Sequence, residues 1–81
     1  MKKDEILEKV KYIFKEELEI DESALLPEAR LKEDLGIDSL DFVDIVVFVD
    51  EHFHIKLVAS DFAGVRTFAE LCHLLDNRIN G

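Results

Sequence analysis

The chain has 81 residues, of which 48% are hydrophobic, and it carries a formal net charge of −9. This length predicts a single domain over residues 1–81 with a modest core, and the acidity argues against nucleic acid or anionic membrane surfaces as partners. There is no long apolar run and no signal-peptide pattern, and only one cysteine, so we expect a cytoplasmic protein without membrane insertion or an internal disulfide.

Apolar residues recur at spacings of three and four over residues 3–18, which predicts an amphipathic helix. Nothing in this helix suggests chemistry, and we interpret it as scaffold. Over residues 19–35 the period is lost, and Pro27 and its polar neighbours favour turns. A connection of this length must be held by its own apolar side chains, and a short helical turn is expected near residues 23–26.

The segment Asp34-Leu35-Gly36-Ile37-Asp38-Ser39-Leu40 leads into the next predicted helix. Gly36 suits a turn with positive φ, and either Asp38 or Ser39 can cap the helix. Asp38 with Asp41 forms an imperfect capping box, because Asp is shorter than the usual Glu or Gln. The Ser39 hydroxyl then lies in the first turn, where the dipole and free N–H groups favour a phosphate ester. The alternative is that Ser39 is only a cap.

Residues 39–53 combine an apolar face with an acidic surrounding. As a helix they place Phe42, Ile45, Val46, Val49 and Phe53 on one core stripe, although the β-branched and aromatic run over 42–49 also suits a strand. The helix leaves Leu40, Val43 and Val47 on a second apolar face, which predicts a protein contact. Seven acids and no base lie from Glu33 to Glu51, so we expect this patch to steer basic partners.

The remaining segments read as links and scaffold. No metal site is expected at His52 and His54, because His73 is remote in sequence. Residues 55–58 form an extended link, and residues 60–63 offer about one helical turn in which Phe62 closes the core. The last helix begins with the capping box of Thr67 and Glu70 and stops at Asn80-Gly81. Its apolar residues, with Cys72 as a small buried one, are Phe68, Leu71, Cys72, Leu75 and Ile79.

The motif around Ser39 resembles the attachment motif of acyl carrier proteins, in which the serine of Asp-Ser-Leu carries phosphopantetheine. The resemblance covers nearly the whole chain. It implies an all-α fold, a small four-helix bundle with three longer helices, one short third helix and a long first loop, and it favours helix over strand for residues 39–53. It also implies 4'-phosphopantetheine attached covalently to Ser39, with Asp38 and Leu40 beside it. The short third helix is commonly acidic in that family, whereas Asp61 is the only acid between Ile55 and Phe68 here. We favour a core position for Phe62 in this region, and the alternative is that it meets the acyl chain or a partner.

No basic partner for Ser39, metal-ligand cluster or glycine-rich phosphate loop is found, so we expect no enzyme. The resemblance implies a stand-alone, monomeric carrier of acyl thioesters for fatty-acid or related biosynthesis. Its partners would be a phosphopantetheinyl transferase and condensing, reducing and acyl-transferring enzymes with basic docking surfaces. A peptidyl carrier fits the acidity less well, and the alternative from another class is an acidic helical interaction domain without a prosthetic group. The residues expected to contact partners are Leu40, Asp41, Asp44, Val47, Asp50 and Glu51, and those expected beside the acyl chain are Phe42, Ile45, Val46 and Val49.

Overall fold

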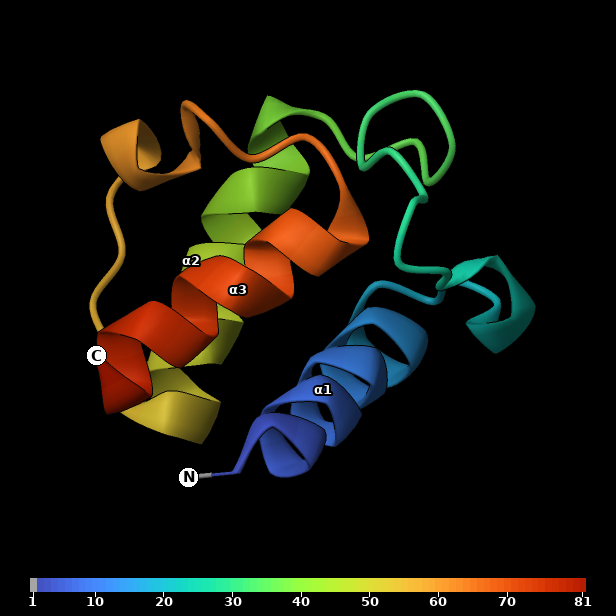
Figure 1. Ribbon diagram of the computed structural model, residues 1–81. Coiled ribbons are helices and arrows are strands. Elements are labelled where there is room, and N and C mark those ends of the chain that lie inside the picture. The colour runs from blue at the N-terminus through green and yellow to red at the C-terminus, as the bar shows by residue number, and fades with distance from the viewer. Residues whose placement is uncertain (1) are drawn as a thin grey trace.

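The computed structural model describes residues 2–81, and every secondary-structure element among them is a helix (Figure 1). The three α-helices are α1 (Lys3–Tyr12), α2 (Ser39–Phe53) and α3 (Phe68–Asn80). Helices α1 and α3 lie side by side and run in opposite directions, and α2 lies behind α3 in the view of Figure 1. The all-α class is confirmed, and residues 39–53 form a helix. Among residues 2–81 no helix has the length and apolar character of a membrane span.

The first predicted helix is formed by two consecutive elements. Helix α1 continues without a break into a π-helical turn, η1 (Ile13–Glu17). Its apolar stripe is buried, as the spacing predicted, with Ile6, Val10, Ile13 and Phe14 each only 1% exposed. The helix ends where Glu19 takes a positive φ of 56°, a conformation that cannot continue a right-handed helix.

The long loop after this helix is held by its own apolar side chains, as predicted. Leu25, Leu31 and Ile37 are at most 4% exposed, and a short 3₁₀ turn, η2 (Glu22–Ala24), forms where one was expected. The loop is also pinned by backbone hydrogen bonds to the start of α3, which sequence periodicity does not predict. The Leu31 N–H donates to the Arg66 carbonyl at 2.8 Å, and the Phe68 N–H donates to the Ala29 carbonyl at 2.9 Å.

The predicted short third helix is a 3₁₀ turn rather than an α-helix, η3 (Ala59–Phe62). Its carbonyl acceptors lie three residues back, as in the 2.9 Å bond from the Asp61 N–H to the Val58 carbonyl. The Asp61 carboxylate accepts from the Val58 N–H and pairs with Arg78 near the end of α3. Phe62 is 9% exposed and joins the core, as predicted.

The core is one apolar cluster between the three helices and the loop. Phe14 and Phe68 meet edge to face in it, with ring centroids 5.3 Å apart. On α2 the buried residues are Ile45, Val49 and Phe53, so the buried part of this helix begins in its second turn. The first turn of α2, which carries Ser39, therefore lies at the edge of the core.

Candidate functional site

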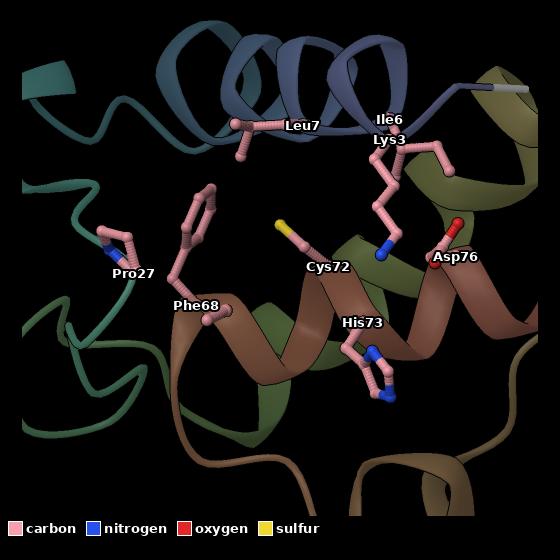
Figure 2. Close-up of a pocket in the computed structure, with 9 residues that line it drawn as sticks. Lys3, Ile6, Leu7, Pro27, Phe68, Cys72, His73 and Asp76 are labelled. Atoms are coloured by element: carbon pink, nitrogen blue, oxygen red, sulfur yellow. The ribbon is translucent and has the colours of Figure 1, made fainter.

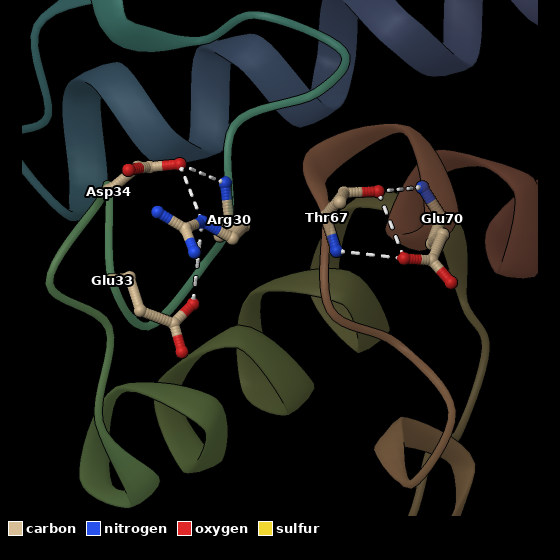
Figure 3. A network of polar contacts seen from close by, with 5 residues as sticks. All are labelled: Arg30, Glu33, Asp34, Thr67 and Glu70. Carbon is tan, nitrogen blue, oxygen red and sulfur yellow. Dashed lines mark hydrogen bonds and ion pairs between the residues drawn. The ribbon is translucent and has the colours of Figure 1, made fainter.

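The turn that leads to Ser39 is closed by the carboxylate of Asp34 (Figure 3). Asp34 Oδ2 accepts from the Arg30 backbone N–H at 2.8 Å and from Arg30 Nε at 3.3 Å. The bond from the Arg30 backbone N–H, with that from its side chain, lowers the pKa of Asp34 below its ordinary value. Gly36 follows with a φ of 68°, which costs glycine little. These two motif residues therefore shape the loop that delivers Ser39.

Helix α2 is capped by Asp38. Asp38 Oδ1 accepts from the N–H groups of Leu40 at 2.9 Å and Asp41 at 3.0 Å. Asp41 Oδ2 in turn accepts from the Asp38 N–H at 3.1 Å. The capping box that seemed imperfect on side-chain length is thus complete.

Ser39 is consequently the first residue of the helix and not its cap. Its side chain is exposed, and within residues 2–81 its hydroxyl has no hydrogen-bond partner. One expectation needs correction, because the N–H groups of Leu40 and Asp41 are not free to bind a phosphate ester: Asp38 already occupies them. The helix dipole remains to favour an anion here.

An apolar groove of about 370 Å³ opens beside Ser39. One wall comes from the first turns of α2 and the other from the link before η3 and from η3 itself. The rings of Phe42 and Phe62 meet between these walls, with centroids 5.1 Å apart and planes tilted by 49°. Such a groove can shelter a hydrocarbon chain from water. It is lined by Ser39, Phe42, Val43, Val46, Leu57, Val58, Ala59 and Phe62.

The four residues expected beside an acyl chain fall into two groups. Phe42 and Val46 line the groove and are half-buried. Ile45 and Val49 are 0% and 2% exposed and belong to the core cluster instead. Leu57, on the groove's second wall, was not among the residues predicted beside an acyl chain. Its only sequence signal was a run of apolar residues in a short link.

The outer face of α2 carries the residues expected to contact partners. Leu40 and Val47 are 75% and 48% exposed, with Val43 at 60% between them. The acids of this face are exposed as well, except that Asp41 is half-buried in the capping box. We call this set the outer face of α2: Leu40, Asp41, Asp44, Val47, Asp50 and Glu51.

A separate hollow, of about 270 Å³, lies between α1 and α3, away from Ser39, and is lined in part by the side chain of Cys72 (Figure 2). Burial raises the pKa of the Cys72 thiol to about 11. The thiol is therefore protonated at neutral pH and is a poor nucleophile. Cys72 was predicted to be a small buried apolar residue; it packs against the core but is only half-buried.

The histidines and Ser39 can also be compared with what metal and nucleophilic sites require, within residues 2–81. Residues 2–81 hold no group of three or more His, Cys, Asp or Glu side chains placed to bind a metal ion. His52 packs edge to face on Tyr12, with ring centroids 5.8 Å apart, and His54 ends α2 in the left-handed conformation. Ser39 has no hydrogen-bonded base in the same residues, and a serine needs one to act as a nucleophile.

Comparisons with known proteins identify what the whole chain is similar to. A family model described as "PP-binding: Phosphopantetheine attachment site" matches residues 8–75. The chain is 36% identical over 77 residues to an acyl carrier protein of Thermotoga maritima, covering 95% of both chains. It is 33% identical over 79 residues to an acyl carrier protein of Thermosynechococcus vestitus, covering 98% of both chains.

Proposed function

Because the chain belongs to the acyl carrier protein family, whose members carry acyl intermediates in fatty-acid biosynthesis, we propose that Ser39 bears its phosphopantetheine arm. Acyl carrier proteins are carriers and not catalysts. Ser39 is then the substrate of a phosphopantetheinyl transferase: the Ser39 oxygen forms a phosphodiester with the phosphopantetheine of coenzyme A, the pyrophosphate bond breaks, and adenosine 3',5'-bisphosphate and the hydroxyl proton leave. The attached arm supplies a terminal thiol, which holds the acyl group as a thioester.

The observation that carries this proposal is that Asp38 caps α2 while the Ser39 side chain takes no part in the cap. Asp38 caps α2 through Leu40 and Asp41, so Ser39 is not needed as a cap. Its hydroxyl is exposed and lacks a hydrogen-bond partner within residues 2–81. The groove opens at the same residue. A hydroxyl placed in this way is accessible to another enzyme and close to a shelter for the cargo.

Intact mass measurement tests the attachment directly. The protein incubated with coenzyme A and a phosphopantetheinyl transferase should gain the mass of one arm. Ser39→Ala should fold with unchanged helicity and gain none, because the accepting oxygen is missing. The exposed serines Ser23 and Ser60 provide matched controls: Ser23→Ala and Ser60→Ala should gain the full mass. Loss of the mass gain in a control, or its persistence in Ser39→Ala, would move or remove the site.

The groove beside Ser39 is the proposed shelter for the acyl chain. Phe42 and Val46 of α2 and Leu57 of the opposite wall supply apolar contacts. A chain tethered at Ser39 has a high effective concentration at these walls. Ile45 and Val49 support Phe42 and Val46 from the core rather than contact the chain.

The outer face of α2 is the proposed docking surface for the transferase and for the condensing, reducing and acyl-transferring enzymes. Its exposed Leu40 and Val47 can fill an apolar depression on a partner. Its acids fit Arg and Lys residues around that depression and speed the encounter more than they tighten the complex.

The remaining features of the proposal concern the whole chain. Residues 1–81 act as one carrier domain, a monomer in the cytoplasm. Turn η3 takes the place of the short third helix in a four-helix bundle, since it packs Phe62 into the core and closes the groove.

A further inference from the structure

A second hollow, of about 470 Å³, shares a wall with the groove beside Ser39. Phe42 and Phe62 line both hollows, so their ring pair forms the partition. Phe42 is only half-buried, and Phe62 is followed by Ala63 and Gly64, which are small. A change of side-chain rotamer at either ring would join the two hollows. The other residues that line the second hollow are Arg30, Leu31, Lys32, Glu33, Ala63, Val65 and Arg66.

The second hollow is cationic in an otherwise acidic protein. It gathers three of the ten Lys and Arg residues of a chain whose net charge is −9. Arg30 is engaged by Asp34 at 3.3 Å and by Glu33 at 3.9 Å. Lys32 and Arg66, in contrast, have no ion-pair partner within residues 2–81. Two positive side chains thus remain available at the far side of the Phe42–Phe62 partition.

We propose that the two hollows form one cargo site, which holds acyl groups with an anionic group, such as a carboxylate, at the end of the chain remote from the thioester. The apolar groove takes the hydrocarbon part, and the cationic hollow takes the terminal carboxylate. This rests on the proposed attachment at Ser39, because the groove is entered from that residue.

Physical chemistry favours this pairing over a plain hydrocarbon cargo. Burying an unpaired carboxylate in an apolar groove is unfavourable in free energy. A chain with a carboxylate at its far end therefore needs a cation close to where that end lies. Arg66 offers a planar guanidinium that binds a carboxylate through two hydrogen bonds, and Lys32 offers a second charge. A plain alkyl chain gains nothing from these cations. No ionic contact would then compensate for separating the rings of Phe42 and Phe62.

Three cargos of equal, medium chain length test the proposal: an alkanoyl group, an ω-carboxyalkanoyl group and the methyl ester of the latter. Each is transferred as its phosphopantetheine conjugate to Ser39, and intact mass verifies loading before melting temperatures are measured. The ω-carboxyl form should melt higher than the ester form by about 4 °C or more. Added salt should reduce this gap, because the contact is ionic and partly open to solvent.

Charge-neutralising variants distinguish an effect of the cationic hollow on the melting temperature from an effect of the net charge. Arg66→Gln combined with Lys32→Gln should abolish the gap between the ω-carboxyl and ester forms. Lys56→Gln removes a charge from an exposed residue that lines neither hollow and should retain the gap. An ω-carboxyl form that melts no higher than the ester form, or a gap that survives in the double variant, would overturn the cargo assignment. Failure of every cargo to load would instead overturn the attachment at Ser39, and mass alone distinguishes the two failures.

Discussion

Asp38 and Asp41 cap helix α2 reciprocally. The carboxylate of Asp38 accepts from the Asp41 N–H at 3.0 Å, and the carboxylate of Asp41 accepts from the Asp38 N–H at 3.1 Å. Thr67 and Glu70 form the same type of box at the start of α3, with bonds of 3.2 and 3.1 Å (Figure 3). The two boxes differ in what they hold in place, since only the first positions Ser39.

The cap of α2 should matter both for stability and for modification. Asp38→Ala removes the acceptor for two N–H groups and should cost about 0.5–2 kcal/mol in the free energy of unfolding. Thr67→Ala is the matched control, because it removes a cap of the same type at α3. Both variants should melt lower, but only Asp38→Ala should slow phosphopantetheine transfer at a temperature where both are folded. Equal rates in the two variants would show that Asp38 acts only through stability.

Charge reversal on the outer face of α2 should slow partner enzymes. Asp44→Lys and Glu51→Lys replace exposed acids with bases, which removes attraction for a basic docking surface and adds repulsion. We expect lower kcat/KM for the transferase, with the largest loss at low ionic strength. Glu17→Lys, an exposed change of the same charge in η1, should leave kcat/KM nearly unchanged. An equal loss in all three variants would indicate a net-charge effect without a docking surface.

The lowered pKa of Asp34 predicts a pH-dependent contribution to stability. A carboxyl group whose pKa is depressed by folding stabilises the folded state above its unfolded pKa, and this is lost as pH falls through the folded pKa. Asp34→Asn should therefore melt below the parent protein at pH 7. The difference should shrink as pH falls below the ordinary value of 3.8. Melting curves from pH 7 to about pH 2 test this, with Glu28→Gln in the same loop as the control. A difference that stays constant with pH would contradict it.

Acyl loading should stabilise the fold if the chain enters the groove. A ligand that binds only the folded state raises the melting temperature, and for a domain of this size each kcal/mol corresponds to roughly 4–8 °C. The form with a medium-length acyl group should thus melt above the form with a bare arm. Val46→Trp fills the groove and should reduce that difference. Leu7→Trp fills the hollow between α1 and α3 and should preserve it. No difference in the parent protein would place the acyl chain on the surface.

Most of the helical structure could be predicted from the sequence because its causes are local. The stripe of α1 and the box of Thr67 and Glu70 depend on residues three or four apart, and both are confirmed. Residues 42–49 were ambiguous, because their β-branched side chains suit a strand. The helix forms because it buries Ile45 and Val49 on one side, and tertiary burial outweighs a modest difference in propensity.

The surroundings of Ser39 were only partly predictable. The motif indicated the turn and a helix start, but it did not decide between Asp38 and Ser39 as the cap. The bond lengths at Asp38 decide that question. The residues predicted beside the acyl chain were chosen from the core stripe of α2. Periodicity cannot tell which residues of an apolar stripe are buried in the core and which line a groove. That depends on the segment of the chain that packs against the stripe.

The sequence alone indicated approximately where the helices begin, which of their faces are apolar and which serine lies near a helix start, since these follow from contacts within a few residues. Only the tertiary structure decided that Leu57 and Phe62 form the groove's second wall. It also decided that Arg30 and Arg66, which are 36 positions apart in the sequence, line one cationic hollow. Contacts of that kind arise when the loop is pinned to the start of α3 by backbone hydrogen bonds. Backbone N–H and C=O groups are the same in every residue except proline, so side-chain patterns carry no record of that pairing.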